Sequence, residues 1–228
     1  MLEYSRMDFQ IVKVKEDILI ENNKKADSLR QFLKEKGIYF INVMASPGSG
    51  KTTLLTRVIN SLKDKYRIGV LEADIDGDVD AERISKNTGV KVIQVHTSGA
   101  CHLTAQMVED ALKAFGVDDL DLIILENVGN LVCPAEFDTG SDINMMLLST
   151  SEGHDKPLKY PLMFQVSKIA VISKMDVAPI FDFDLEKAKE NILYRNKDAK
   201  IFTVSAIKNE GVDELIKYID SLVEKKVK

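Results

Sequence analysis

The residues from Ala45 to Thr52 read Ala-Ser-Pro-Gly-Ser-Gly-Lys-Thr and directly follow an apolar stretch at residues 38–44. Glycines at this spacing let backbone N–H groups turn inward around phosphate oxygens, and the positive end of the following helix adds to the attraction. Lys51 can reach the β- and γ-phosphates, and the Thr52 hydroxyl can ligate Mg²⁺. The sequence therefore predicts a nucleoside triphosphate site, although Ala45 stands where the pattern G-x-x-x-x-G-K-S/T has glycine. The residues expected around the phosphates are Pro47, Gly48, Ser49, Gly50, Lys51, Thr52 and Thr53.

Acidic residues follow two of the later apolar stretches. Glu126 ends the stretch at residues 120–125, where a carboxylate can hold Mg²⁺ directly or through water. The backbone N–H of Gly129 can reach a γ-phosphate, and Asp74 is the candidate for a further Mg²⁺ contact or for positioning water. We therefore expect Mg²⁺ near Thr52, Asp74 and Glu126, and catalytic roles for Lys51, Asp74 and Glu126. The acids Asp76, Asp78 and Asp80 are interpreted as a solvated loop.

Two segments near the C-terminus favour guanine as the base. Residues 173–176 read Ser-Lys-Met-Asp and resemble the N-K-x-D motif, with Ser173 in place of asparagine. The Asp176 carboxylate can accept from N1–H and the exocyclic amine of guanine, and the Lys174 stem can lie along the base. Ser205 and Ala206 resemble the S-A-K loop, whose backbone contacts the guanine carbonyl oxygen. Because Ser173 replaces asparagine, one supporting hydrogen bond is in doubt.

Three further residues have side chains that bind transition metals. Cys101 and His102 are adjacent, and Cys133 follows four residues after Gly129. Thiolate and imidazole suit Zn²⁺ and Ni²⁺. A closed tetrahedral site needs a fourth ligand, from water, another residue or a second subunit placed by a two-fold axis. The alternative is that both cysteines are small core residues and that His102 is a surface histidine.

Composition limits the class of protein that can carry these groups. The chain has 228 residues, 45% hydrophobic and 29% charged, which suits one α/β domain with a small appendage. A net charge of −5 gives no basic footprint, so we expect no nucleic acid partner. No apolar run approaches the ~20 residues of a membrane span, and the N-terminus lacks a signal-peptide core. We therefore expect a cytoplasmic protein without a membrane partner, whose two cysteines are free thiols or metal ligands.

Alternating strands and helices must position these side chains. The apolar pattern predicts strands at residues 38–44, 67–72, 90–95, 120–125, 144–149, 168–173 and 200–204. It predicts helices at residues 53–63, 81–87, 103–115, 183–196 and 212–224, with one or two amphipathic helices within residues 9–36. This order indicates an α/β fold, a mostly parallel sheet with helices on both faces. We expect an N-terminal helical extension at residues 1–37 and a P-loop GTPase domain at residues 38–228.

Several longer runs resemble the hydrogenase nickel-incorporation GTPases, the HypB family. The most specific run is Glu-Asn-Val-Gly-Asn-Leu-Val-Cys-Pro-Ala-Glu-Phe-Asp at residues 126–138. Further matching runs lie at residues 46–55, 80–83, 101–103 and 150–161, so the resemblance covers nearly all of the chain from Ile38 onward. The resemblance implies a dimerising GTPase of the SIMIBI class that acts in nickel delivery to [NiFe]-hydrogenase.

The resemblance also implies cofactors, ligands and partners. It implies GTP and Mg²⁺, and it implies that Cys101, His102 and Cys133 bind Ni²⁺ or Zn²⁺ at or near a dimer interface. It implies a homodimer that works with other hydrogenase maturation proteins, including a nickel chaperone, and with the hydrogenase large subunit. Some relatives carry an N-terminal cysteine cluster or a histidine-rich stretch, whereas this chain has no cysteine before Cys101 and only 3 histidines. High-affinity nickel storage is therefore not expected.

Two other functions remain open on the residues alone. A urease-type nickel chaperone of the same class typically has Cys-Pro-His, whereas here Cys133 and Pro134 are not followed by histidine. The other function is a non-catalytic metal carrier that uses nucleotide only as a structural ligand. The sequence shows no obvious catalytic glutamine or arginine finger, so we expect slow turnover of GTP.

Overall fold

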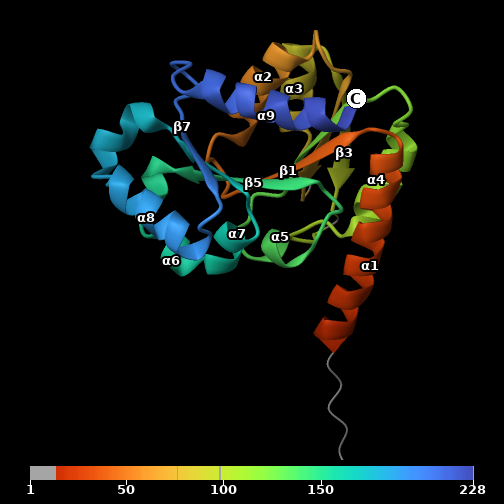
Figure 1. Cartoon of the computed structure of the whole chain (residues 1–228), viewed down its shortest axis with the longest axis horizontal. Helices are drawn as coiled ribbons and strands as arrows, with labels where there is room; N and C mark the ends of the chain where they lie inside the picture. The colour runs from red at the N-terminus through yellow and green to blue at the C-terminus, as the bar shows by residue number, and fades with distance from the viewer. Residues whose placement is uncertain (1–13, 76, 98, 228) are drawn as a thin grey trace, which may run out of the picture.

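A computed structural model describes residues 14–75, 77–97 and 99–227, which form one sheet covered by helices on both faces (Figure 1). The sheet has seven strands in the order β3-β2-β4-β1-β5-β6-β7. The strands are β1 Tyr39–Ala45, β2 Ile68–Asp74, β3 Lys91–His96, β4 Leu122–Glu126, β5 Ile143–Ser149, β6 Ile169–Ser173 and β7 Lys200–Thr203. Every pair of neighbouring strands is parallel. The predicted α/β fold with a parallel sheet is confirmed.

The helices divide between the two faces because successive side chains of a strand point to opposite sides. In β1, Ile41 and Val43 pack against α2, α3 and α9, whereas Phe40 and Met44 face the helices on the other side. The long helices are α1 Val14–Glu35, α2 Lys51–Leu62, α3 Val79–Thr88, α4 Ala105–Phe115, α8 Leu185–Arg195 and α9 Val212–Val227. The short helices are α5 Cys133–Glu136, η1 Thr150–Glu152, α6 Lys156–Lys159, α7 Pro161–Gln165 and η2 Met175–Phe181. Strands buried on both faces explain the nearly continuous apolar runs of the sequence.

The short helices are where the sequence prediction was least complete. The sequence predicted no helix between residues 125 and 144, but α5 begins there at Cys133 with proline at its second position. A helix of four residues has no apolar period to detect, and proline fits the first turn because its missing N–H has no intrahelical partner there. Cys133 therefore sits at a helix start rather than within a loop.

The described part of the N-terminal region forms helix α1, which packs on α4 and on the sheet beside it (Figure 1). Ala26, Leu29 and Leu33 are buried, and the last two join the core with Phe40 of β1. Helix α1 ends at Glu35 and the chain turns at Gly37, where φ is +70°, before β1. Residues 1–13 of the predicted extension lie outside the described residues. The boundary between two domains at residue 37 stays a prediction.

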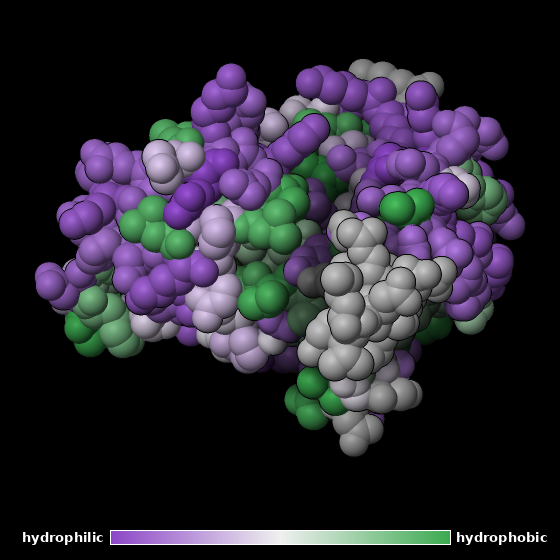
Figure 2. Space-filling model, turned by 90° about the horizontal axis from the view of Figure 1, so that it is seen from below, coloured by the Kyte–Doolittle hydropathy of each residue, from purple (hydrophilic) through white to green (hydrophobic). Residues whose placement is uncertain are grey.

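The face of the molecule seen from below is mainly hydrophilic where the structure describes it (Figure 2). On the face seen from below, hydrophobic residues form separate small groups among charged and polar ones (Figure 2). Among residues 14–75, 77–97 and 99–227, no helix has the length and apolar character needed to cross a bilayer.

Candidate functional site

The predicted phosphate loop connects β1 to α2 at the carboxyl edge of the sheet. Ala45 is the last residue of β1, fully buried and paired with Leu147 of β5. It is therefore part of the strand, where no glycine conformation is needed. Gly48 and Gly50 do require glycine, since their φ angles are +70° and +95°. Gly50 is the N-cap of α2, so the first free N–H groups of that helix face the loop.

Residues from two other segments hold this loop. The Ser173 hydroxyl donates to the carbonyl oxygen of Ser49 at 2.8 Å, and the Lys174 Nζ donates to that of Gly48 at 2.6 Å. On the other side, a Cβ placed on Gly129 would lie 2.9 Å from the Pro47 Cγ and 3.1 Å from its backbone N. Ser173 thus supplies a hydrogen bond to the loop from the position where the related motif has asparagine.

The segments predicted to recognise guanine meet beside the loop. The Asp176 Oδ1 accepts from the Ser205 hydroxyl at 2.7 Å, and the Ser205 oxygen in turn accepts from the backbone N of Lys208 at 3.2 Å. The carbonyl oxygen of Ala206 accepts from the Arg57 Nε at 3.2 Å. A small hollow of about 60 Å³ is lined by Ser49, Gly50, Thr53, Leu54, Ser173, Lys174, Asp176, Val204, Ala206 and Ile207. The structure therefore brings the predicted base-binding residues together at one end of α2.

A buried acidic cluster lies on the opposite side of the loop. The Thr52 Oγ1 donates to the Glu126 Oε1 at 2.8 Å. Glu126 is 2% exposed and pairs across the strands with Glu72, which is 3% exposed. The remaining carboxyl oxygen of each has no hydrogen-bond partner among the described residues. Carboxylate oxygens of Glu72, Asp80 and Glu126 lie within 4.8 Å of one another, and such an oxygen set fits Mg²⁺ or its bound water.

The electrostatics of this cluster favour a cation. Burial raises the pKa of Glu126 to about 7, and the charge of Lys51 and the hydrogen bond from Thr52 oppose that shift. Burial also raises the pKa of Glu72 to about 7, with the negative charge of Glu126 adding to the effect. Two carboxylates this close repel each other when both are ionised. A divalent cation here would relieve that repulsion.

The structure corrects part of the predicted acidic set. Asp80 was interpreted as a solvated loop acid, but it lies in the first turn of α3, half-buried, beside Glu126. Asp74 lies at the end of β2 and lines a cavity together with Glu72, Asp80 and Glu126. Its Oδ1 accepts from the backbone N of Gly77 at 3.0 Å. Asp76 lies outside the described residues. Glu72 was not singled out from the sequence. The signal that could have indicated it is a charged residue inside an otherwise apolar strand.

The cavity over the phosphate loop also includes an arginine that the sequence analysis did not single out. The cavity is about 300 Å³ and is lined by Gly48, Gly50, Lys51, Thr52, Thr53, Asp80, Arg83, Glu126 and Lys174. Arg83 reaches it from α3, one helical turn after Asp80. It is therefore a further cation, beside Lys51 and Lys174, for negative charge on phosphate oxygens. Arg83 stands within the run at residues 80–83, which was noticed only as part of the family resemblance.

The three predicted metal ligands converge at the start of α4 and the start of α5. The Cys101 and Cys133 sulfur atoms lie 2.9 Å apart, farther than the ~2.05 Å of a disulfide bond. The Cys101 sulfur is 3.8 Å from the His102 Nδ1, and all three ligand atoms lie within 4.8 Å of one another. Two thiols and one imidazole form a donor set that fits Ni²⁺ or Zn²⁺. The described residues of one chain supply three ligands.

Neighbouring groups affect the pKa values and the orientation of these candidate ligands. Burial lowers the pKa of His102, with Glu136 opposing the shift, so the imidazole favours the neutral form that binds metals. The His102 ring also stacks on Phe137, with ring centroids 3.8 Å apart. The pKa of the Cys133 thiol is raised, mainly by its contact with Cys101 and then by burial. Packing against Phe137 therefore orients the His102 ring.

One short segment connects the phosphate loop to the thiols. It begins at Gly129, which contacts Pro47, and ends four residues later at Cys133. Within it, the Asn130 Nδ2 donates to the carbonyl oxygen of Cys101 at 3.2 Å, and its Oδ1 accepts from the Val132 N at 2.9 Å. A displacement at Gly129 would therefore reach both cysteines through residues 129–133.

Comparison with known proteins identifies close relatives of the chain. Residues 39–203 match the CobW/HypB/UreG nucleotide-binding domain family. The chain is 40% identical over 212 residues to hydrogenase maturation factor HypB of Escherichia coli, with 93% of this chain and 73% of that protein covered. It is 40% identical over 213 residues to the hydrogenase/urease maturation factor HypB of Helicobacter hepaticus, with 92% and 87% covered. The crystal structure of HypB from Helicobacter pylori in complex with nickel superposes with a TM-score of 0.83 at 37% identity, covering 91% of this chain and 97% of that one.

Proposed function

The chain belongs to the HypB family within the CobW/HypB/UreG nucleotide-binding domains, and from this membership we propose that it is a GTP-hydrolysing switch for nickel delivery in [NiFe]-hydrogenase maturation. The observation that carries the proposal is the segment of residues 129–133, which begins against the phosphate loop and ends at Cys133, one of three clustered residues whose side chains could hold a metal ion. A switch needs one element that both ligands contact. The cytoplasmic location expected from the sequence is part of the same proposal.

The nucleotide-binding residues have separate roles in this proposal. Asp176, oriented by the Ser205 hydroxyl, accepts from the guanine N–H groups. Lys174 stabilises the phosphate loop through its hydrogen bond to the Gly48 carbonyl oxygen. Lys51 neutralises charge on the β- and γ-phosphates. Thr52, Glu126 and the acids beside them would hold Mg²⁺, which neutralises phosphate charge when bound. Asp74 remains the candidate to position the attacking water.

Hydrolysis of GTP is tested by phosphate release. We expect slow turnover by the wild type that Lys51→Ala abolishes, because the lysine charge acts on the phosphates being separated. The matched control is Lys63→Ala at the end of α2, whose Nζ donates to the Thr88 carbonyl oxygen outside the phosphate cavity. A wild type that binds GTP without releasing phosphate would instead favour the non-catalytic carrier.

Nickel and a second subunit complete the proposal. Cys101, His102 and Cys133 supply three ligands, and a homodimer with its axis near Cys133 would supply the others. Further partners would be other maturation proteins, including a nickel chaperone, and the hydrogenase large subunit. Urease maturation is a second candidate target of nickel delivery, because one relative is named a hydrogenase/urease maturation factor.

Mass measurement of the native protein tests the metal and the dimer together. We expect the mass of a dimer with bound Ni²⁺ when a non-hydrolysable GTP analogue and Ni²⁺ are both present, and loss of the metal in Cys133→Ser. Zn²⁺ in place of Ni²⁺ compares the two candidate metals. A monomer under every condition would contradict the shared site.

A further inference from the structure

Helix α1 contacts both metal-bearing segments through one buried amide. Asn22 is 7% exposed and uses both ends of its side chain. Its Nδ2 donates to the carbonyl oxygen of Asp138 at 2.8 Å, and its Oδ1 accepts from the backbone N–H of Ala105 at 2.9 Å. Asp138 lies five residues after Cys133, and Ala105 lies three residues after His102. A single side chain of α1 therefore joins the two stretches of chain that carry the thiols and the imidazole.

The bond to Ala105 fixes the start of α4. Ala105 is the first residue of that helix, and its N–H has no intrahelical acceptor. The N-cap side chain of Thr104 is already engaged, since it accepts from the Met107 N at 3.3 Å. Asn22 therefore satisfies a buried donor that the Thr104 side chain leaves open, shortly after Cys101 and His102.

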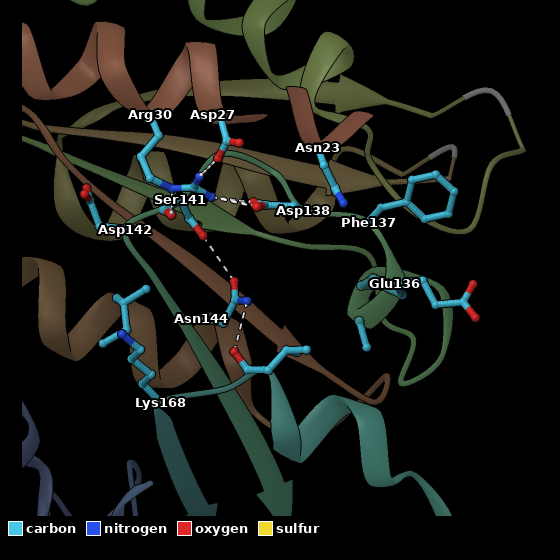
Figure 3. Close-up of a pocket in the computed structure, with 14 residues that line it drawn as sticks. Asn23, Asp27, Arg30, Glu136, Phe137, Asp138, Ser141, Asp142, Asn144 and Lys168 are labelled. Carbon is cyan, nitrogen blue, oxygen red and sulfur yellow. Dashed lines mark hydrogen bonds and ion pairs between the residues drawn. The ribbon is translucent and has the colours of Figure 1, made fainter. Parts of the chain in front are cut away.

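On the other segment, α1 binds Asp138 a second time. The Arg30 Nη2 lies 2.7 and 2.8 Å from the two Asp138 carboxylate oxygens, and its Nε donates to the Ser141 carbonyl oxygen at 3.0 Å (Figure 3). Phe137, next to Asp138, stacks on His102. A shift of Asp138 would therefore move the neighbouring Phe137 ring, which stacks on the His102 imidazole.

A cleft separates the rest of α1 from this segment. It is about 510 Å³ and lies between Asn23, Asp27 and Arg30 of α1 and residues 134–138, as Figure 3 shows. Beside the cleft, α1 is attached to the segment of residues 134–138 by the polar side chains of Asn22 and Arg30 rather than by packed apolar surface. Such contacts fix the direction and distance between α1 and this segment.

We propose that Asn22 is a positioning residue for the metal site. By holding Asp138 and Ala105 together, it sets the distance between Cys133 and the pair Cys101–His102, so the attachment of α1 controls how well the three ligands converge. The inference rests on the proposed metal function of those three residues. Groups that orient ligands from outside the coordination sphere commonly change metal affinity by 10–100-fold.

Titration with Ni²⁺ alone, and the absorption spectrum of the Co²⁺-loaded protein, test this role. We expect Asn22→Ala to weaken Ni²⁺ binding by roughly tenfold and to shift the thiolate-to-metal and d–d bands of Co²⁺. Amide hydrogen exchange at Ala105 should become faster, while GDP affinity should stay at the wild-type value. Asn23→Ala is the matched control, because this neighbour on α1 is exposed and lines the cleft.

The outcomes separate this inference from the proposed function. If the wild type binds no Ni²⁺, or if Cys133→Ser binds it equally well, the metal site and this inference are both wrong. If the wild type binds Ni²⁺ and Asn22→Ala matches it in affinity and Co²⁺ spectrum, only the positioning role is wrong. Should Asn22→Ala not fold, the half-buried Arg30→Gln carries the test, with a smaller loss of affinity expected in the same direction.

Discussion

Asp176 is oriented by a second side chain before any base is bound. The Ser205 hydroxyl donates to its Oδ1, and the Ser205 oxygen accepts a backbone N–H in turn, so the carboxylate is fixed in one direction. Lys174, at φ +60°, and Ser173 both bind carbonyl oxygens of the phosphate loop. The proposed recognition of the base and the shape of the phosphate loop therefore share these few hydrogen bonds.

Replacing this carboxylate by an amide should change which base is preferred. In Asp176→Asn, the amide N–H₂ would face the guanine N–H groups, and hydrogen bonds worth about 1.5–3 kcal/mol to a charged group are lost. We expect the GDP affinity to fall by at least about tenfold, and xanthosine diphosphate, which has a carbonyl at that edge, to gain. Calorimetric titration with both nucleotides measures the change, and Asp182→Asn is the control. An unchanged ratio of the two affinities would exclude Asp176 from base recognition.

Gly129 lies against the phosphate loop at a distance that excludes a side chain. A Cβ there would lie 2.9 Å from the Pro47 Cγ and 3.2 Å from the Pro47 Cα. In Gly129→Ala the segment must move away from the loop, which withdraws its N–H from the γ-phosphate position. We expect the affinity for a non-hydrolysable GTP analogue to fall several-fold more than the affinity for GDP. GDP serves as the internal control, and an equal loss for both would show that Gly129 does not sense the γ-phosphate.

At the scale of elements, α9 is held to the core by a buried apolar face and by a polar cluster with α2 and the turn after it. Val212, Leu215, Ile219 and Val223 are fully buried. Beside them, the Asp220 Oδ1 accepts from the Lys65 Nζ and from the Tyr66 hydroxyl, each at 2.6 Å. These hydrogen bonds, from Lys65 first and then Tyr66, lower the pKa of Asp220.

This lowered pKa predicts a pH-dependent contribution to folding. A carboxyl with a depressed folded-state pKa stabilises the protein above its unfolded pKa of about 3.9, and this stability is lost as the pH falls through the folded pKa. We expect Asp220→Asn to lower Tm at pH 7 by about 2–4 °C, for a loss of about 1 kcal/mol. The difference from the wild type should shrink below pH 4. Thermal unfolding at several pH values measures it, with the exposed Asp64→Asn as control, and a pH-independent difference would exclude the ionised form as the cause.

At the scale of the whole molecule, the nucleotide and metal sites share the carboxyl edge of one sheet. Strand β4 ends at Glu126 beside the phosphate loop, and the chain then passes Gly129 to reach Cys133. Strand β3 ends at His96, shortly before Cys101 and His102. Parallel strands place all these chain ends on one edge, which makes coupling between the sites physically direct.

Coupling of the two sites must be reciprocal. We expect the Ni²⁺ affinity measured with GDP and with a non-hydrolysable GTP analogue to differ by a factor within about 5–150, typical of coupled sites. Ni²⁺ must then change the ratio of the two nucleotide affinities by the same factor. Equilibrium titration in both directions checks this, with Cys133→Ser as the control that removes the dependence. Equal Ni²⁺ affinities in the two nucleotide states would end the switch hypothesis.

The contiguous motifs were determined by the sequence alone. The phosphate loop, the strand end at Glu126, the Ser173–Asp176 segment that begins at the end of β6, and the alternation of strands and helices each depend on neighbouring residues. Local geometry is set by propensity, by glycine conformation and by apolar period, all of which are readable within a short window. For that reason the predicted parallel sheet and the order of its elements agree with the structure.

Only the tertiary structure decided which distant side chains meet. Glu72 and Asp80 join Glu126 because β2 neighbours β4 in the sheet and α3 returns over the phosphate loop. Cys101 and Cys133 are 32 residues apart in the chain, and Asn22 contacts Asp138 across 116 positions. Such contacts depend on strand order and on the packing of α1 against α4, which no local pattern encodes. The sequence alone therefore determined the chemistry available to this protein, and long-range packing decided which groups act together.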